Sequence, residues 1–288
     1  MAAIVDPLSE RAEPGRSSRR EDQLSAAIRD ACVVEATSPK CGNVHPGASF
    51  DDLRYEHFVA AASIAADTLT AFDVPLSRRI ADCVQKTRDV CGTNVNLGIA
   101  LLIGPLVEAA RRCPSEPREA VVDVLGSFTP ADGGIIAAAI ASAAAGGLGD
   151  APEHDVRQVG DVDILAAMRA AVDRDDVARQ WATRYADLID VVVPMLDDEV
   201  EGADDIGDAI RDAALRILAD RVDTLIARKN GRRIAEEVRR RAKGLDRRDP
   251  VAVADFDRYL RSNGNRLNPG TTADLIAAAL FWRYVRPV

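Results

Sequence analysis

Residues Thr129–Ala145 read TPADGGIIAAAIASAAA, and this stretch decides the class of fold. Thr129 is suited to cap a helix, Pro130 to occupy its first position, and Asp132 to place a carboxylate in its first turn. The alanine-rich run that follows has high helix propensity, and its small side chains let neighbouring helices pack closely. We therefore predict a helix over Ala131–Ala145.

The same logic extends to the rest of the chain, where apolar residues recur at helical spacing between Gly, Pro, Asn or Asp boundaries. Aromatic residues make up only 4% of a chain that is 47% hydrophobic, which favours helices over a β-sandwich. No strand alternation and no repeat of fixed period is visible. We expect an all-α fold with further helices at Leu24–Glu35, Tyr55–Ala71, Pro75–Val90, Asn96–Arg111, Ser115–Leu125, Asp163–Asp173, Asp176–Val193, Asp205–Arg228, Arg232–Lys243, Pro250–Ser262 and Thr272–Tyr284.

The predicted organisation is one multi-helical domain behind a short leader. Met1–Arg20 contain Pro, Gly and a Ser-Ser-Arg-Arg run without apolar periodicity, so we interpret residues 1–20 as flexible and residues 21–288 as the domain. Gly146–Val162 is rich in Gly, Pro and Asp, and we expect a long surface connection there.

Charge and cysteine content limit the classes of partner. A formal net charge of −9 disfavours nucleic acid and anionic membranes as partners. The longest apolar stretches are shorter than the ~20 residues that cross a bilayer, so we predict no membrane span. The chain has five cysteines, no C-x-x-C pair and no signal peptide, which indicates reduced thiols in a cytoplasmic protein. A homodimer is a possible oligomeric state.

A first polar block, Glu35–Leu53, lies between two predicted helices. Its candidate ligand-binding residues are Lys40, Gly42, Asn43, His45, Asp51 and Asp52. Glycines let backbone N–H groups approach a phosphate, and Lys40 would supply compensating charge. Asp51 and Asp52 offer hard oxygen ligands for Mg²⁺. The alternative is that Pro and Gly only turn the chain while Asp52 caps the next helix.

A second block places Thr93, Asn94 and Asn96 around the start of a very apolar helix. Free N–H groups and the helix dipole favour an anion at such a place. The alternative is that Asn94 or Asn96 simply caps the helix.

A third block comes in two pieces. Arg228 and Lys229 lie near a helix C-terminus, where an interaction with the dipole explains them. Further along the chain, polar residues precede the final helix and could shape a site for a phosphate or a metal-bound phosphate; they are Asn268, Gly270, Thr271 and Asp274. Asp274 could instead complete a capping box. There is no Walker A loop, Rossmann fingerprint or G-x-S-x-G elbow.

In this order, the blocks resemble the triphosphoribosyl-dephospho-CoA synthase family from about Glu21 to the C-terminus. That family carries a Pro-Lys-Pro-Gly-x-Val loop followed by an Asp-Met pair, a Thr-x-x-Asn-x-x-x-Gly type segment, an Asp-Thr…Arg segment and a final Pro-Gly-Gly-Ser-Ala-Asp-Leu motif. The corresponding stretches here are Pro39–Val44, Asp52-Leu53, Thr93–Gly98, Asp223-Thr224…Arg228 and Pro269–Leu275.

The resemblance implies an all-helical enzyme in which ATP donates its triphosphoribosyl group to dephospho-CoA with loss of adenine. Such a displacement needs a carboxylate base and charge neutralisation around the triphosphate. We therefore assign Asp52 or Asp274 as the base or a Mg²⁺ ligand, Lys40 and Arg228 as phosphate ligands, and Asn94 and Asn96 as groups that orient the sugar or phosphates. The first and third blocks should meet at one pocket, which the second also lines, and Lys40 should be an exposed loop residue.

The chain also departs from the family pattern. Cys41 replaces the second proline, Leu53 replaces the methionine, and Asn96-Leu97 stand where one branch has a His-Lys pair. These features resemble a divergent branch in archaea and in bacteria with methanopterin-linked metabolism, which implies a different acceptor as an alternative. A nucleotide sensor and a Mg²⁺-dependent nucleotide hydrolase are the rival classes.

Overall fold

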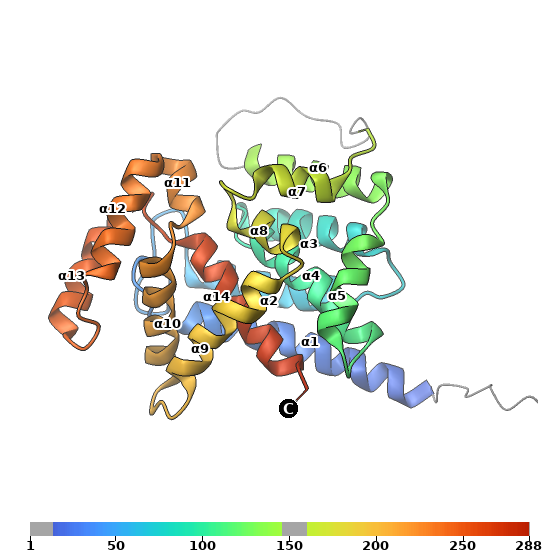
Figure 1. The fold of residues 1–288 in the computed structure, drawn as a ribbon, viewed down its shortest axis with the longest axis horizontal. Helices are drawn as coiled ribbons and strands as arrows, with labels where there is room; N and C mark the ends of the chain where they lie inside the picture. The colour runs from blue at the N-terminus through green and yellow to red at the C-terminus, as the bar shows by residue number, and fades with distance from the viewer. Residues whose placement is uncertain (1–13, 146–159, 288) are drawn as a thin grey trace, which may run out of the picture.

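The computed structural model describes residues 14–145 and 160–287, and it confirms the all-α prediction (Figure 1). Within those ranges the only strand element is the short β1 (Ser262–Asn265). The helices of the first half are α1 (Pro14–Thr37), α2 (Tyr55–Leu69), α3 (Leu76–Cys91), α4 (Leu97–Arg112), α5 (Pro117–Gly126) and α6 (Pro130–Ala145). The second half contains α7 (Ile164–Ala171), α8 (Asp176–Ala182), the π-helix η2 (Leu188–Val192), α9 (Val193–Val200), α10 (Ile206–Asp220), α11 (Thr224–Asn230), α12 (Arg232–Lys243), α13 (Pro250–Arg261) and α14 (Gly270–Val285).

The last residues of the predicted leader, from Pro14 onward, are helical in the structure. Helix α1 begins at Pro14 rather than near Glu21, with proline in the first turn where its missing N–H costs no hydrogen bond. Residues 1–13 of the predicted leader, and most of the predicted connection over Gly146–Val162, lie outside the described residues.

The prediction of one helix over Asp176–Val193 was wrong, because α8 stops early. Arg184 and Tyr185 both have positive φ, which is uncommon for residues with a side chain. The bend turns Tyr185 into the core, where its hydroxyl donates to the carbonyls of Leu101 at 3.1 Å and Leu102 at 2.8 Å. Pro105 has no N–H for the Leu101 carbonyl, so this contact replaces a lost helical hydrogen bond.

The prediction of one helix over Asp205–Arg228 was also wrong. The chain leaves α10 at Arg221, which is extended, and Asp223 starts α11. One carboxylate oxygen of Asp223 accepts from the backbone N–H groups of Leu225 and Ile226, both at 3.0 Å. An aspartate that caps the following turn competes with helix continuation, and apolar periodicity does not reveal that competition.

Two hydrophobic cores divide the protein, and α14 lies beside both. The larger core joins α1–α10, η2 and α14, whereas the smaller core lies among α10–α13. Figure 1 shows α14 crossing the centre of the molecule, with α11–α13 at one side. Cys41 and Leu267 both enter the smaller core, so the first polar block and the turn before α14 are anchored at the same place.

In the described part of the chain, no single helix is long and apolar enough to cross a membrane. One bent pair, α5 with most of α6, reaches that length only when its two helices are counted together, and they meet at 96°.

Candidate active site

The first and third polar blocks lie side by side, although more than two hundred residues separate them. Asn43 donates from Nδ2 to Oδ1 of Asn268 at 2.7 Å, and both side chains are buried. Gly42 has φ +75, and a Cβ there would collide with Leu260 and crowd Pro269. Glycine is therefore needed at position 42 to seat the loop against α13 and the start of α14.

Lys40 corrects one sequence-based expectation. Its side chain is 1% exposed rather than open to solvent, and Nζ pairs with Oε1 of Glu35 at 2.8 Å. Nζ also donates to the Glu35 and Ser38 carbonyl oxygens. A buried ion pair with its donors used in this way holds the end of α1 to the loop, and it does not present Lys40 to a phosphate.

Asp52 lies away from this ion pair. It is exposed, and its Oδ2 accepts from Nδ2 of Asn265 at 2.6 Å. Asp51 is exposed beside it. The three aspartates assigned to metal do not form one cluster: across the described ranges, no group of three or more His, Cys, Asp or Glu residues is arranged to hold a metal ion. The ring of His45 accepts from the N–H of Gly47 at 3.2 Å, and burial lowers its pKa.

The asparagines of the second block serve the fold directly. Oδ1 of Asn94 accepts from the N–H of Leu97 at 3.1 Å, which is the capping role given as the alternative, and Thr93 beside it is partly buried. Asn96 is 1% exposed and donates from Nδ2 to Oγ1 of Thr87 at 2.7 Å. Asn96 therefore points inward, towards α3.

Asp274 is the fifth residue of α14, just beyond its first turn, and it does not cap the helix. Among the described residues, its carboxylate makes no hydrogen bond or ion pair, and no side chain caps the helix. The carboxylate lies against Gly98 at the start of α4, in the space that a Cβ on Gly98 would fill. This contact brings the second and third blocks together, although a glycine, not one of the predicted asparagines, makes it.

The environment of Asp274 is acidic. Burial raises its pKa well above the usual range, the nearby charges of Glu35 and Asp223 raise it further, and Arg228 lowers it. Repulsion between carboxylates in a poorly solvated place favours the protonated form or a bound cation.

The remaining residues of the third block lock α14 to α11. Oγ1 of Thr271 accepts from the N–H of Leu225 at 3.1 Å, and Gly270 packs against the same leucine without room for a Cβ. Thr272 donates from both N–H and Oγ1 to Oδ2 of Asp223, at 2.8 and 2.9 Å. Asp223 thus holds the first turns of both helices, a function that its Asp-Thr motif did not reveal.

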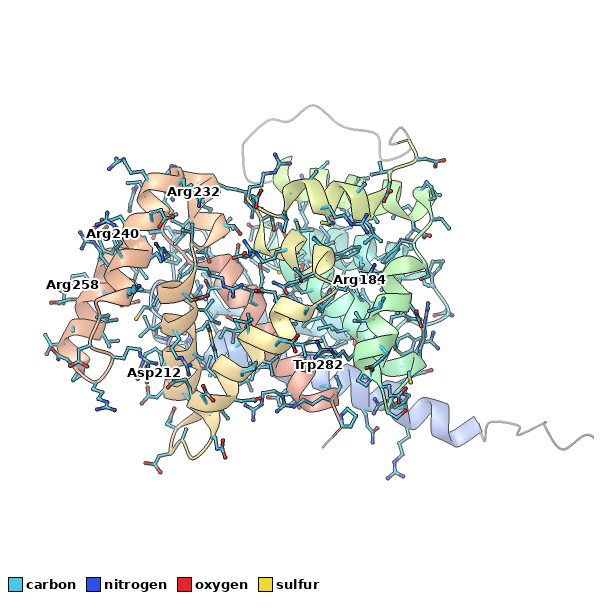
Figure 2. The ribbon with its side chains drawn as sticks, viewed as in Figure 1. Arg184, Asp212, Arg232, Arg240, Arg258 and Trp282 are labelled. Atoms are coloured by element: carbon cyan, nitrogen blue, oxygen red, sulfur yellow. The ribbon has the colours of Figure 1, made fainter. Side chains whose placement is uncertain are left out.

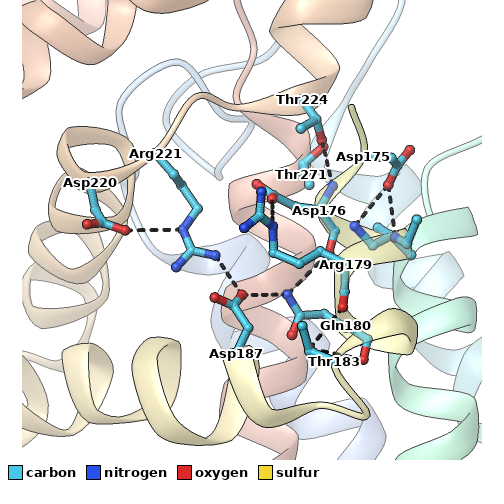
Figure 3. Close-up of polar contacts among 12 residues, drawn as sticks. Asp175, Asp176, Arg179, Gln180, Thr183, Asp187, Asp220, Arg221, Thr224 and Thr271 are labelled. Carbon is cyan, nitrogen blue, oxygen red and sulfur yellow. Dashed lines mark hydrogen bonds and ion pairs between the residues drawn. The ribbon is translucent and has the colours of Figure 1, made fainter. Parts of the chain in front are cut away.

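A polar network missed at the sequence level extends from these helices to α8 (Figure 3). The backbone N–H of Asp176 donates to Oγ1 of Thr224 at 3.3 Å, and that hydroxyl contacts Oγ1 of Thr271 at 3.1 Å. Burial raises the pKa of Asp176 to about 6, while Arg221 and Arg179 act to lower it. The sequence feature that could have indicated this network is the pair of aspartates, Asp175 and Asp176, at the start of α8. From the sequence alone such a pair is interpreted as a helix cap.

A magnesium ion could bind beside Asp274 only if substrate phosphates supplied further ligands. Asp223 already accepts four hydrogen bonds, and Glu35 is paired with Lys40, so Asp274 carries the free carboxylate. Mg²⁺ is commonly held by one or two carboxylates together with substrate phosphates and water. The unpartnered Asp274 meets the protein's share of such a site.

The helical fold with its recessed acidic site matches a known class of enzyme. A profile of the ATP:dephospho-CoA triphosphoribosyl transferase (CitG) family matches residues 21–287, so the chain is a transferase. It belongs to the ATP:dephospho-CoA triphosphoribosyl transferase family, as the motifs indicated.

Comparison of structures supports the fold. A crystal structure from Archaeoglobus fulgidus, described as a candidate triphosphoribosyl-dephospho-CoA synthase, superposes with a TM-score of 0.62 at 19% sequence identity. The similarity covers 79% of this chain and 98% of that one. At this identity it shows the shared fold alone. No curated protein sequence matches the chain.

Proposed function

We propose that this protein transfers the triphosphoribosyl group of ATP to a hydroxyl of dephospho-CoA and releases adenine. The observation that carries the proposal is the carboxylate of Asp274, which is mostly buried, has no partner among the described residues, and lies against Gly98 where the second and third polar blocks meet. An unpartnered carboxylate in a recess costs stability, so a chemical role is the simplest reason for its presence.

The reaction is a displacement at the anomeric carbon of the ribose. The bond between that carbon and the adenine nitrogen breaks, and a bond to the acceptor oxygen forms. Asp274 takes the hydroxyl proton, and adenine leaves with the bonding electron pair and picks up a proton. Burial and the neighbouring carboxylates raise the pKa of Asp274, and a carboxylate with a raised pKa is, once ionised, a stronger base for the hydroxyl proton.

Asp274 is a better candidate for the base than Asp52. Asp52 is exposed and already accepts a hydrogen bond from Asn265, whereas Asp274 is recessed and free. Arg228 supports a negatively charged substrate nearby, since its charge reaches the Asp274 carboxylate. Magnesium, when bound, would neutralise part of the triphosphate charge.

One observation favours a different acceptor as the second candidate. The inward-pointing Asn96 bonds to Thr87 and Cys83 and therefore is not presented to a substrate. This is the position at which one branch of the family has histidine, followed there by lysine and here by Leu97. The chemistry at Asp274 is the same for an acceptor from methanopterin-linked cofactor synthesis.

The test is a chromatographic assay of the full-length protein with ATP, Mg²⁺ and dephospho-CoA. Adenine release in the wild type, and its loss in Asp274→Asn, is the expected result. ADP or inorganic phosphate in place of adenine would identify a hydrolase and overturn the proposal. Adenine formed only with another hydroxyl acceptor would establish the second candidate, and no product with any acceptor would favour a nucleotide sensor.

A further inference from the structure

A cavity of about 420 Å³ opens between α8, the end of α10, α11 and α12. Its size lies within the range of small-molecule sites. Six arginines line it against four carboxylates, although the whole chain carries a net charge of −9. The arginines are Arg174, Arg179, Arg221, Arg228, Arg232 and Arg239.

Several of these guanidinium groups have donors to spare. Arg179 is 40% exposed and uses Nε on Asp176 at 3.0 Å, whereas Arg228 is 55% exposed and uses one Nη on Asp175 at 2.5 Å. In the described part of the chain, their other terminal nitrogens have no protein acceptor. Arg174 is exposed at the rim and makes no ion pair with any residue that the structure describes. Guanidinium groups with free paired donors are suited to phosphate oxygens.

The cavity adjoins the recess that contains Asp274. Thr224 lines the cavity, and its hydroxyl contacts that of Thr271, which lies one turn before Asp274 on α14. Arg228 also lines the cavity, and its charge reaches the Asp274 carboxylate. A chain of phosphates in the cavity would therefore end near the carboxylate that we assign as the base.

We propose that this cavity binds the phosphate chain of a substrate, with Arg174, Arg179 and Arg228 as the phosphate ligands. The proposal rests on the proposed function for the identity of the substrate: the chain is the triphosphate of ATP or the diphosphate of the acceptor. The phosphate ligand is then not Lys40, which is buried in an ion pair, but three arginines that come from a loop, α8 and α11.

The experiment is a calorimetric titration of the full-length protein with inorganic triphosphate, which requires no turnover. Wild type should bind it, and both Arg174→Gln and Arg228→Gln should weaken binding by about tenfold or more, as expected for a lost charge-assisted hydrogen bond. Arg174 is the cleaner position, because its replacement breaks no ion pair among the described residues. The matched control is Arg258→Gln on α13, which is 76% exposed and lies well away from Arg232 at the cavity (Figure 2).

Equal affinity for triphosphate in wild type and both cavity variants would overturn the proposal, as would an equal loss in Arg258→Gln. Steady-state competition then identifies the source of the phosphates. Inhibition by triphosphate that is competitive with ATP assigns the cavity to the donor, and inhibition competitive with dephospho-CoA assigns it to the acceptor. Triphosphate binding that follows the arginines, in a protein that releases no adenine, would reject the proposed function and keep the phosphate site.

Discussion

The carboxylate of Asp274 occupies the space into which a side chain at Gly98 would project. This contact joins the N-terminal part of α14 to the first turn of α4, and it explains why the second polar block ends in a glycine. The absence of a side chain at position 98 leaves a recess at the positive end of the α4 dipole, where an anionic group is favoured. A substitution at Gly98 therefore tests whether the position of the Asp274 carboxylate matters for the reaction.

Gly98→Ala should reduce adenine release by at least ~10²-fold, because the new methyl group would displace the carboxylate that acts as the base. Alanine is the better helix former by about 1 kcal/mol, so propensity alone predicts no loss of stability. The matched control is Gly126→Ala at the end of α5, where a Cβ meets nothing within 4 Å. Normal turnover in Gly98→Ala would show that the position of Asp274 does not matter.

Asp274→Asn should lower turnover by at least ~10²-fold without lowering the free energy of unfolding at pH 7. Removal of a charge that Glu35 and Asp223 oppose relieves repulsion in the folded state. Thermal melts and adenine release measured on one preparation check both parts. Asp67→Asn on α2, where the carboxylate is 73% exposed, serves as the control and should change neither. A stable variant with an unchanged rate would remove Asp274 from the reaction.

Lys40→Met should destabilise the protein by about 3–5 kcal/mol, because it leaves Glu35 buried without its partner. The double variant Lys40→Met/Glu35→Gln should recover much of that loss, since no uncompensated charge then remains. Denaturant unfolding of both variants with wild type and Glu35→Gln completes a double-mutant cycle. Equal stability of Lys40→Met and wild type would mean that the ion pair contributes nothing.

The raised pKa of Asp176 leads us to predict that the free energy of unfolding depends on pH. Its pKa in the folded protein is about 6, above the value of 3.8 for an exposed aspartate. Folding therefore favours its protonated form, and this contribution is full below pH 3.8 and is lost as the pH rises through 6. Since each pKa unit corresponds to about 1.4 kcal/mol, the loss amounts to about 3 kcal/mol.

Urea unfolding of wild type and Asp176→Asn from pH 4 to pH 7 tests this dependence. The stability of the asparagine variant relative to wild type should rise across that range, because asparagine does not ionise. Asp255→Asn on α13, where the carboxylate is 59% exposed, should show no comparable trend. A constant difference between wild type and Asp176→Asn would indicate that Asp176 titrates as an ordinary exposed group.

The sequence was most informative where a property depends on neighbours along the chain. Apolar periodicity and the capping signals around Pro130 and Pro250 located most helices within a few residues of their observed bounds. The errors came where a distant partner decides the conformation. Tyr185 leaves the helical region to reach a carbonyl that Pro105 leaves free on α4, and no local pattern reports a contact across eighty residues.

The sequence by itself determined the fold class, through apolar periodicity and helix caps, and the family, through the order of its polar blocks; it also indicated candidate residues for a site. Only the tertiary structure decided which of those residues are available to a ligand. Lys40 and Asn96 are turned inward because buried polar groups must be paired, whereas Asp274 is left free. The arginine-lined cavity exists because α8, α11 and α12 meet, and burial, pairing and proximity of this kind are properties of the packed chain rather than of its sequence pattern.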